Sequence, residues 1–218
     1  MTPFAMRWEL SVVCATDRPG SFGASMGNDA GRAALIQREL AADGYRHAGE
    51  VSLWNALHPD EEAMFVGAYP GGVLVCHADL AGALIHGNAW SRVNRDLRGD
   101  FRDRVLRLFP HGEVMALALH CVTKLWGFSA YRAMRRVRAM AGSAEDGLFV
   151  DSGTPLAEEL PLLAEHGAGS LEAADGETRA SAGEALVLAA SARMFGTAID
   201  RLAGTGPTLS HFRRRPAA

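Results

Sequence analysis

Two apolar, β-like runs, residues 64–69 and 73–77, are separated only by Pro70-Gly71-Gly72. Glycine accepts the positive φ that a tight turn demands, and so short a connection joins two strands only in antiparallel order. This segment predicts a β-hairpin, and any fold of the chain has to contain that antiparallel pair.

Other strand candidates support the same kind of sheet. Residues 126–131 and 137–141 predict a second hairpin, with the basic segment 132–136 at its turn. Residues 114–121 are a continuous apolar run of strand length, which is typical of a central strand covered on both faces. Further short strands are expected at residues 10–15, 148–150 and 209–212, the last of them at the sheet edge.

Helices are expected between other strands and near both ends of the chain. The candidates are residues 28–43, with Asn28 or Asp29 as N-cap, and residues 79–85, 96–109 and 184–202. Residues 166–183 lack apolar periodicity and predict an exposed loop, and residues 213–218 a frayed basic tail. The order of elements predicts an α+β fold, a mostly antiparallel β-sheet with helices packed on it, in a single domain over residues 1–218.

Composition narrows the classes of function. The formal net charge of −3 predicts no attraction of the whole chain to nucleic acid or to an anionic membrane. The cysteines Cys14, Cys76 and Cys121 are too few and too far apart for a disulfide framework or a C-x-x-C site, which favours a reducing compartment. A signal peptide and the roughly 20-residue apolar span of a transmembrane helix are both missing. We therefore expect a cytoplasmic protein with no metal or cofactor.

The first candidate for chemistry is His120, with Cys121 beside it and Lys124 close behind. A histidine next to a cysteine suggests a thiolate and its base, but adjacent residues of a strand point to opposite faces, which argues against this pair. Two interpretations of His120 stay open. It is either a hydrogen-bonded residue at a strand end or, acting alone, a ligand contact or acid–base group.

The second candidate is His77 with Asp79. A continuing strand would place both side chains on one face, a spacing that metals can use, with His120 as a third ligand if the two strands are neighbours. Asp79 has a simpler alternative role as N-cap of a helix that starts at Leu80, and we favour this role.

A basic cluster at the second hairpin is the third candidate, and it consists of Arg132, Arg135, Arg136 and Arg138. Strand alternation predicts that Arg136 and Arg138 share one face, as a basic strip that could bind a phosphate or an acidic partner. The alternative is a solvated hairpin tip. Familiar signatures of phosphate loops, nucleophile elbows and zinc helices are missing, and so is any nucleic-acid-binding motif.

Several short motifs follow one another along residues 10–213. They are Tyr69-Pro70-Gly71-Gly72-Val73-Leu74-Val75-Cys76, Leu119-His120-Cys121-Val122-Thr123-Lys124-Leu125-Trp126, Gly153-Thr154-Pro155-Leu156, Gly183-Glu184, Phe195-Gly196 and Ser210-His211-Phe212-Arg213. Together they resemble a family of bacterial proteins, common in actinobacteria, that is known only as a domain of unknown function. In that family's pattern a histidine and a tryptophan match His120 and Trp126, whereas an acidic residue stands in place of Lys124 and an aspartate in place of His77. The resemblance implies a bacterial, cytoplasmic protein and gives no activity.

Two hypotheses of function follow. The first is a binding or interaction protein that recognises a protein partner or a small ligand. The second is an enzyme or ligand-binding protein in which His120 acts as acid, base or contact for an anionic substrate. Its other binding residues would be His77, Lys124, Trp126, Arg136 and Arg138. The second hypothesis requires these side chains to line one pocket.

Overall fold

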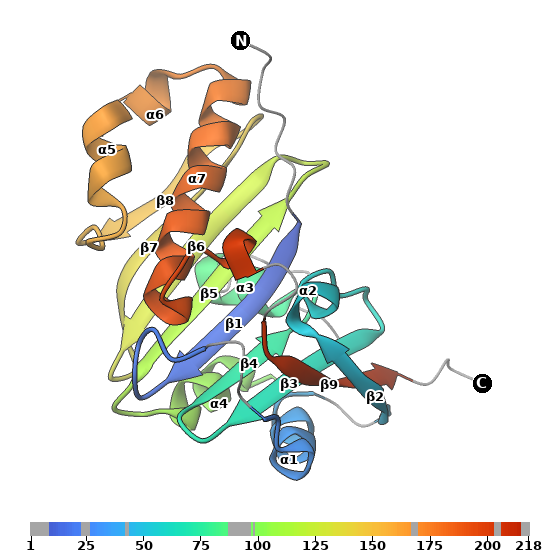
Figure 1. The fold of residues 1–218 in the computed structure, drawn as a ribbon. Helices are drawn as coiled ribbons and strands as arrows, with labels where there is room; N and C mark the ends of the chain where they lie inside the picture. Colours follow the sequence, from blue (N-terminus) through green and yellow to red (C-terminus); the bar gives the residue numbers. More distant parts are fainter. Residues whose placement is uncertain are drawn as a thin grey trace.

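The computed structural model describes residues 9–22, 27–41, 44–86, 97, 99–166, 170–202 and 206–214. Within these residues nine strands form one open sheet, and every neighbouring pair is antiparallel. The strands are β1 (Leu10–Thr16), β2 (Tyr45–Ser52), β3 (Ala63–Tyr69), β4 (Gly72–Cys76), β5 (Glu113–His120), β6 (Leu125–Arg132), β7 (Arg135–Ser143), β8 (Gly147–Gly153) and β9 (Thr208–Arg214). Their order is β2-β9-β3-β4-β1-β5-β6-β7-β8 (Figure 1). The expected α+β class is confirmed.

Both predicted hairpins are present. Pro70 and Gly71 join β3 to β4, and Ala133 and Met134 join β6 to β7. The predicted central strand is also confirmed, because β5 lies between β1 and β6 and its side chains alternate between two buried clusters. Short turns therefore fix the register of the sheet at two places.

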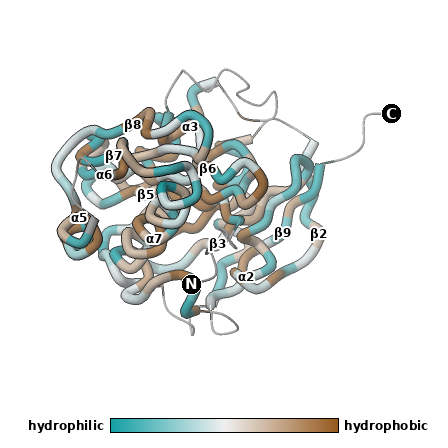
Figure 2. The backbone as a smooth tube through the Cα atoms, turned by 90° about the horizontal axis from the view of Figure 1, so that it is seen from above, coloured by the Kyte–Doolittle hydropathy of each residue, from teal (hydrophilic) through white to brown (hydrophobic). Residues whose placement is uncertain are grey.

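Helices cover both faces of the sheet. One face, which we call the α7 face, carries Leu117 and Trp126 and packs against α2 (Leu53–Ala56), α5 (Leu160–His166), α6 (Ser170–Ala173), α7 (Gly176–Phe195) and the 3-10 helix η2 (Ile199–Leu202). The other, the α3 face, carries Ala116 and Tyr131 and packs against α1 (Ala30–Leu40), α3 (Leu80–His86) and α4 (Phe101–Leu108). Seen from above, β5, β6 and β7 lie between α3 and α7 (Figure 2). No helix in the described ranges is both long and apolar enough to cross a membrane.

Helix α7 packs directly on the indole of Trp126, which has no exposed surface. The side chain of Asp175 caps the helix by accepting a hydrogen bond from the N–H of Thr178, and Gly196 ends it with a φ of 74°. A Cβ atom at Gly183 would lie 2.1 Å from Cδ2 of Trp126. The indole therefore fills the space that a side chain at position 183 would need.

The predicted exposed loop over residues 166–183 is wrong wherever this stretch is described. His166 ends α5, residues 170–173 form α6, and α7 begins at Gly176. Residues 167–169 lie outside the described part. The buried side of α7 uses small residues at this end, among them Ala180, Ala182 and Gly183, so the sequence carries no conventional stripe of large apolar residues there.

The prediction that the last strand lies at the sheet edge is also wrong. β9 lies between β3 and an edge strand, β2, that the sequence pattern did not indicate. Every residue of β2 is exposed or half-buried, and a bulge between His47 and Gly49 interrupts its register, so it shows no clean alternation. Arg213 and Arg214 belong to β9 rather than to a frayed tail, and residues 215–218 lie outside the described part.

The contact between Gly183 and Trp126 makes a testable prediction. Replacing Gly183 by alanine forces α7 away from the sheet, and overpacking of this kind costs roughly 1–3 kcal/mol of unfolding free energy. Gly31 in α1 is a matched control, because it is exposed and its added Cβ would come no closer than 3.4 Å to Oδ1 of Asp29. Gly31→Ala should stabilise the protein by about 0.5–1 kcal/mol. Urea unfolding of the two variants measures both effects, and equal stabilities would contradict the packing described.

Candidate functional site

His120 lies at the end of β5 with its side chain 45% exposed. Its Nδ1 accepts the backbone N–H of Thr123 at 3.2 Å, and Oγ1 of Thr123 lies 2.9 Å from the same nitrogen. An Nδ1 that accepts a hydrogen bond leaves the proton of the neutral ring on Nε2, which lies 3.8 Å from Oε1 of Glu9. His120 is thus a hydrogen-bonded residue at a strand end that presents an N–H group to solvent.

His77 lies in the interior, with no exposed surface. Its Nδ1 accepts the backbone N–H of Asp79 at 3.2 Å, and its Nε2 lies 3.5 Å from the hydroxyl of Tyr45. The carbonyl of Asp79 accepts the N–H of Ala83, which puts Asp79 at the position before the first turn of α3. No group of three or more metal-ligating side chains occurs among the described residues.

Lys124 and Trp126 follow His120 but face different surroundings. Lys124 sits in the turn between β5 and β6 with a φ of 50°, and its ammonium group pairs with the carboxylate of Glu177 near the start of α7. Trp126 is buried beneath α7. The turn therefore holds His120 and Lys124 where β5 ends and β6 begins, whereas Trp126 is part of the hydrophobic core.

The two arginines of β7 do not share a face, so that prediction is wrong. Arg136 lies opposite Tyr131, on the α3 face, and Nη1 of Arg136 donates to the carbonyl of Ile85 at 3.4 Å. Arg138 lies opposite Ala130, on the α7 face. A register shift between Ala130 and Tyr131 inserts one extra residue in β7, and this reverses the expected alternation.

Arg138 is held inside the protein by two carboxylates. Its Nη2 lies 2.8 Å from Oε2 of Glu159, which has no exposed surface, and its Nη1 lies 2.5 Å from Oδ1 of Asp151. Burial disfavours the charged guanidinium, but these ion pairs outweigh it and raise the pKa of Arg138 above its usual value. Arg138 thus joins β7 to the segment that leads into α5.

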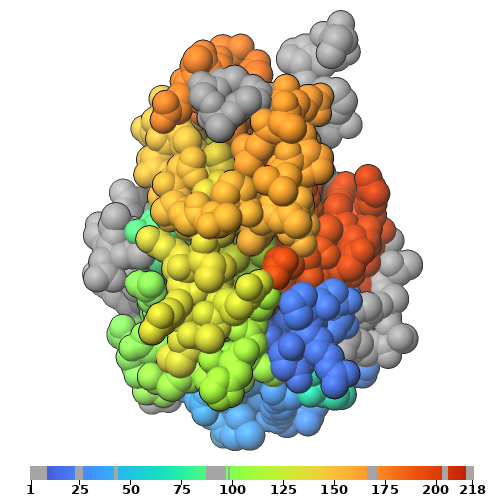
Figure 3. Space-filling view, turned by 90° about the vertical axis from the view of Figure 1, so that its left-hand side faces the viewer, coloured from blue at the N-terminus to red at the C-terminus, as the bar shows by residue number. Residues whose placement is uncertain are grey.

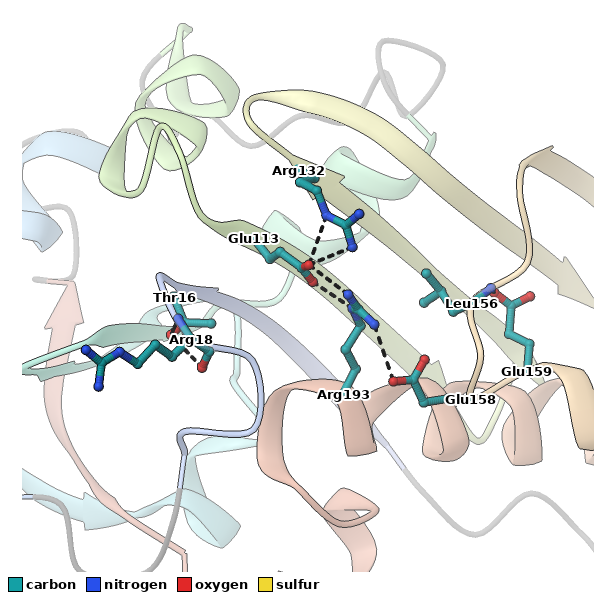
Figure 4. A network of polar contacts seen from close by, with 8 residues as sticks. All are labelled: Thr16, Arg18, Glu113, Arg132, Leu156, Glu158, Glu159 and Arg193. Carbon is teal, nitrogen blue, oxygen red and sulfur yellow. Dashed lines mark hydrogen bonds and ion pairs between the residues drawn. The ribbon is translucent and has the colours of Figure 1, made fainter.

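A second polar network centres on Glu113 at the start of β5 (Figure 4). Arg193 of α7 donates to both carboxylate oxygens at 2.6 and 2.7 Å, and Arg132 donates to Oε1 through Nε and Nη2. Arg193 also reaches Oε1 of Glu158 at 3.4 Å. Burial opposes ionisation of Glu113, but the hydrogen bonds from Arg193 and Arg132 prevail and hold its pKa below the usual range.

The tip of the β6–β7 hairpin is the most exposed part of this region. Six consecutive residues, 132–137, are exposed, and we call them the hairpin tip. The two turn residues, Ala133 and Met134, have φ angles of 46° and 64°. Arg132 and Arg135 lie directly opposite each other and close the turn. The yellow segment that contains the hairpin tip lies on the surface shown in Figure 3.

The structure does not bring the predicted site residues together in one place. His120 and Lys124 lie at the β5–β6 turn. Trp126 and Arg138 are buried on the α7 face, whereas Arg136 lies on the α3 face. His77 is buried beside Tyr45. Sequence reasoning missed the Glu113 network and the left-handed turn. The first depends on contacts between residues far apart in the chain, and alanine and methionine give no signal of a positive φ.

Removal of Arg138 tests the buried ion pair. Arg138→Met leaves the carboxylate of Glu159 inside the protein without its cation, which should cost about 3–5 kcal/mol of unfolding free energy. Adding Glu159→Gln removes the uncompensated charge and keeps an oxygen for the N–H of Leu156, which Glu159 accepts at 2.7 Å. The double variant should regain most of the loss in urea unfolding. A cost below about 1 kcal/mol for the single variant would show that the pair is not buried as described.

The Glu113 network should make stability depend on pH. The pKa of Glu113 is lower in the folded protein than in the unfolded chain, so its contribution is present above the unfolded value of about 4.3 and is lost as pH falls through the folded value. Glu113→Gln should therefore cost more than about 1 kcal/mol at pH 7 and progressively less below pH 4. Urea unfolding of both proteins from pH 7 to pH 2.5 measures the difference, and a constant difference would contradict the proposed ionisation.

The comparisons with known proteins agree with the sequence motifs. No curated protein and no solved structure shows significant similarity to the chain. One family model, described as a family of unknown function and designated DUF6928, matches residues 8–210. The match contains nearly all of the motifs that carry the resemblance noted above, and it supplies no activity. The chain therefore belongs to DUF6928, a family of unknown function.

Proposed function

We propose that this protein is a binding protein that recognises another protein through its hairpin tip, residues 132–137. The observation that carries the proposal is the exposure of all six residues on a turn whose two central residues, Ala133 and Met134, both adopt left-handed conformations. Residues with a Cβ atom avoid this region, at a cost of roughly 1–2 kcal/mol each. Local strain of this kind is concentrated at functional sites.

The side chains of the hairpin tip favour protein recognition. Met134 is 41% exposed and Val137 is 36% exposed, and they stand among Arg132, Arg135 and Arg136. Methionine and arginine are enriched in protein interfaces relative to the rest of protein surfaces. An apolar residue flanked by planar cations suits a partner surface that offers both apolar and acidic groups.

The proposal places the protein in the bacterial cytoplasm. Cys14 and Cys76 are buried free thiols whose pKa values are raised by burial, and Cys121 is also a free thiol. Three free thiols suit a reducing compartment. A bacterial source is implied by the resemblance described above.

A second candidate function is ligand contact through His120, in the manner of an enzyme or a ligand-binding protein for small anions. It is favoured by the fixed tautomer, because the hydrogen bond from Thr123 to Nδ1 directs an N–H group at Nε2 toward solvent. The nearest predicted companion, Lys124, is already paired with Glu177. This candidate therefore rests on one side chain.

Selection from a random peptide display library tests the two candidates together. We expect the wild-type protein to enrich peptides that shift the backbone NMR signals of residues 132–137. A variant with Ala133→Asn and Met134→Gly relaxes the turn and removes its apolar side chain. Its free energy of unfolding, measured in urea, should be higher than that of the wild type by about 1 kcal/mol. It should bind the same peptides more weakly.

Val122→Ser is the matched control, because Val122 is 80% exposed on the β5–β6 turn, at the opposite end of β6 from the hairpin tip. The proposal predicts unchanged peptide binding for this variant. Peptides that shift the signals of residues 120–124 instead, and that lose affinity in Val122→Ser or His120→Ala, would favour the second candidate. Selection that enriches no peptide contacting the hairpin tip would refute the proposed function.

A further inference from the structure

The residues that close the β6–β7 turn carry like charges. Arg132 and Arg135 are directly opposite each other in the last pair of the ladder. Side chains of an opposed pair point to the same face of the sheet, and like charges at such positions repel each other. The α7 face holds both arginines, because Arg132 bonds to Glu113, its partner on β5, and Glu113 bonds to Arg193 of α7.

The acidic groups nearby satisfy only part of this positive charge. Glu113 is already bonded at both oxygens by Arg193, at 2.6 and 2.7 Å, and Arg132 adds to one of these oxygens at 2.9 and 3.0 Å. Glu158 interacts with Arg193. Within the described residues, Arg135 makes no hydrogen bond or ion pair with any side chain, and the side chain of Arg132 is 58% exposed. Arg132 can therefore turn toward an external anion while Arg193 continues to hold Glu113.

We infer that Arg132 and Arg135 act as a clamp for a carboxylate on an acidic segment of the protein partner. Two guanidinium groups that approach from opposed strands can each donate paired N–H groups to one carboxylate, and the bound anion removes their mutual repulsion. The inference rests on the proposed function and adds the chemistry of the partner to it.

The flanking side chains favour an acidic protein segment over a nucleic acid. Met134 precedes Arg135 in the turn that the two arginines close, and it is 41% exposed, so the turn also offers an apolar side chain to a partner. A peptide with leucine next to glutamate satisfies both contacts. A phosphodiester backbone satisfies only the charges, and the hairpin tip has no aromatic side chain on which bases could stack.

Binding of defined peptides tests the clamp. The probe is a fluorescein-labelled peptide of repeated Glu-Glu-Leu units, and its partner probe carries glutamine in place of every glutamate. Fluorescence polarisation should show at least about tenfold weaker binding for the glutamine peptide, and the same loss for Arg132→Gln and for Arg135→Gln. Arg135→Lys should also weaken binding, because lysine lacks the paired donors of arginine. Binding should weaken as the salt concentration rises.

Arg213→Gln is the matched control. The side chain of Arg213 is 54% exposed, much like that of Arg132, and it pairs with the carboxylates of Asp60 and Glu62. It lies on β9, near the other edge of the sheet. This variant should bind the acidic peptide like the wild type. Thermal melting of each variant verifies that it is folded.

The outcomes separate the clamp from the proposed function. Equal affinity for the two peptides, or equal losses in Arg213→Gln and Arg135→Gln, would overturn the clamp. The proposed function would survive this result if the display-selected peptides still contacted the hairpin tip. The inference that the partner is an acidic protein segment would also be contradicted if a single-stranded DNA oligonucleotide or inorganic phosphate bound more strongly than the acidic peptide. If neither these probes nor any selected peptide contacted the hairpin tip, both proposals would fail.

Discussion

The ion pair between Arg138 and Glu159 determines which arginines of β7 reach the surface. Both side chains are buried, and the pair is completed by Asp151 on the next strand. A guanidinium enters the interior only where carboxylates compensate its charge, so this pair fixes the register of β7 at Arg138. The bulge in front of it then turns Arg136 to the other face and leaves the hairpin tip beyond the packed part of the sheet. The same pair ties the segment before α5 to the sheet.

A rigid sheet can hold a turn that is locally unfavourable. β6 and β7 are buried along most of their lengths between α3 and α7, and their register is fixed by many hydrogen bonds. This framework holds the two turn residues, Ala133 and Met134, in left-handed conformations that residues with a Cβ atom seldom adopt. It also holds Arg132 opposite Arg135 despite their repulsion. The hairpin tip thus combines three locally unfavourable features: left-handed turn residues, two opposed arginines and exposed apolar side chains. Features of this kind are concentrated at functional sites.

The fold was predictable where turns and apolar runs are adjacent in the sequence. Pro70-Gly71-Gly72 and the apolar run of β5 each encode their structure locally, and the hairpins and the antiparallel class follow from them. The start of α7 was not predictable from periodicity, since small residues such as Gly183 make room for Trp126, a residue far away in the chain. The bulge in β7 was equally hidden, because the residues around it carry no local signal and the carboxylate that pairs with Arg138 belongs to Glu159, far along the chain. The basic hairpin was therefore identified correctly, but Arg136 and Arg138 do not share a face as the sequence predicted.

The distribution of chemical groups supports the proposed binding function. Catalysis needs acid–base groups and charge-stabilising groups directed at the same reacting atom. Here the candidate histidines lie apart, His77 in the interior and His120 at an exposed turn. Among the described residues, the most buried ion pair, Arg138 with Glu159, joins β7 to the segment before α5. Recognition of a partner needs only a rigid, exposed arrangement of apolar and charged groups. The hairpin tip has this arrangement, and the buried lengths of β6 and β7 hold it in place.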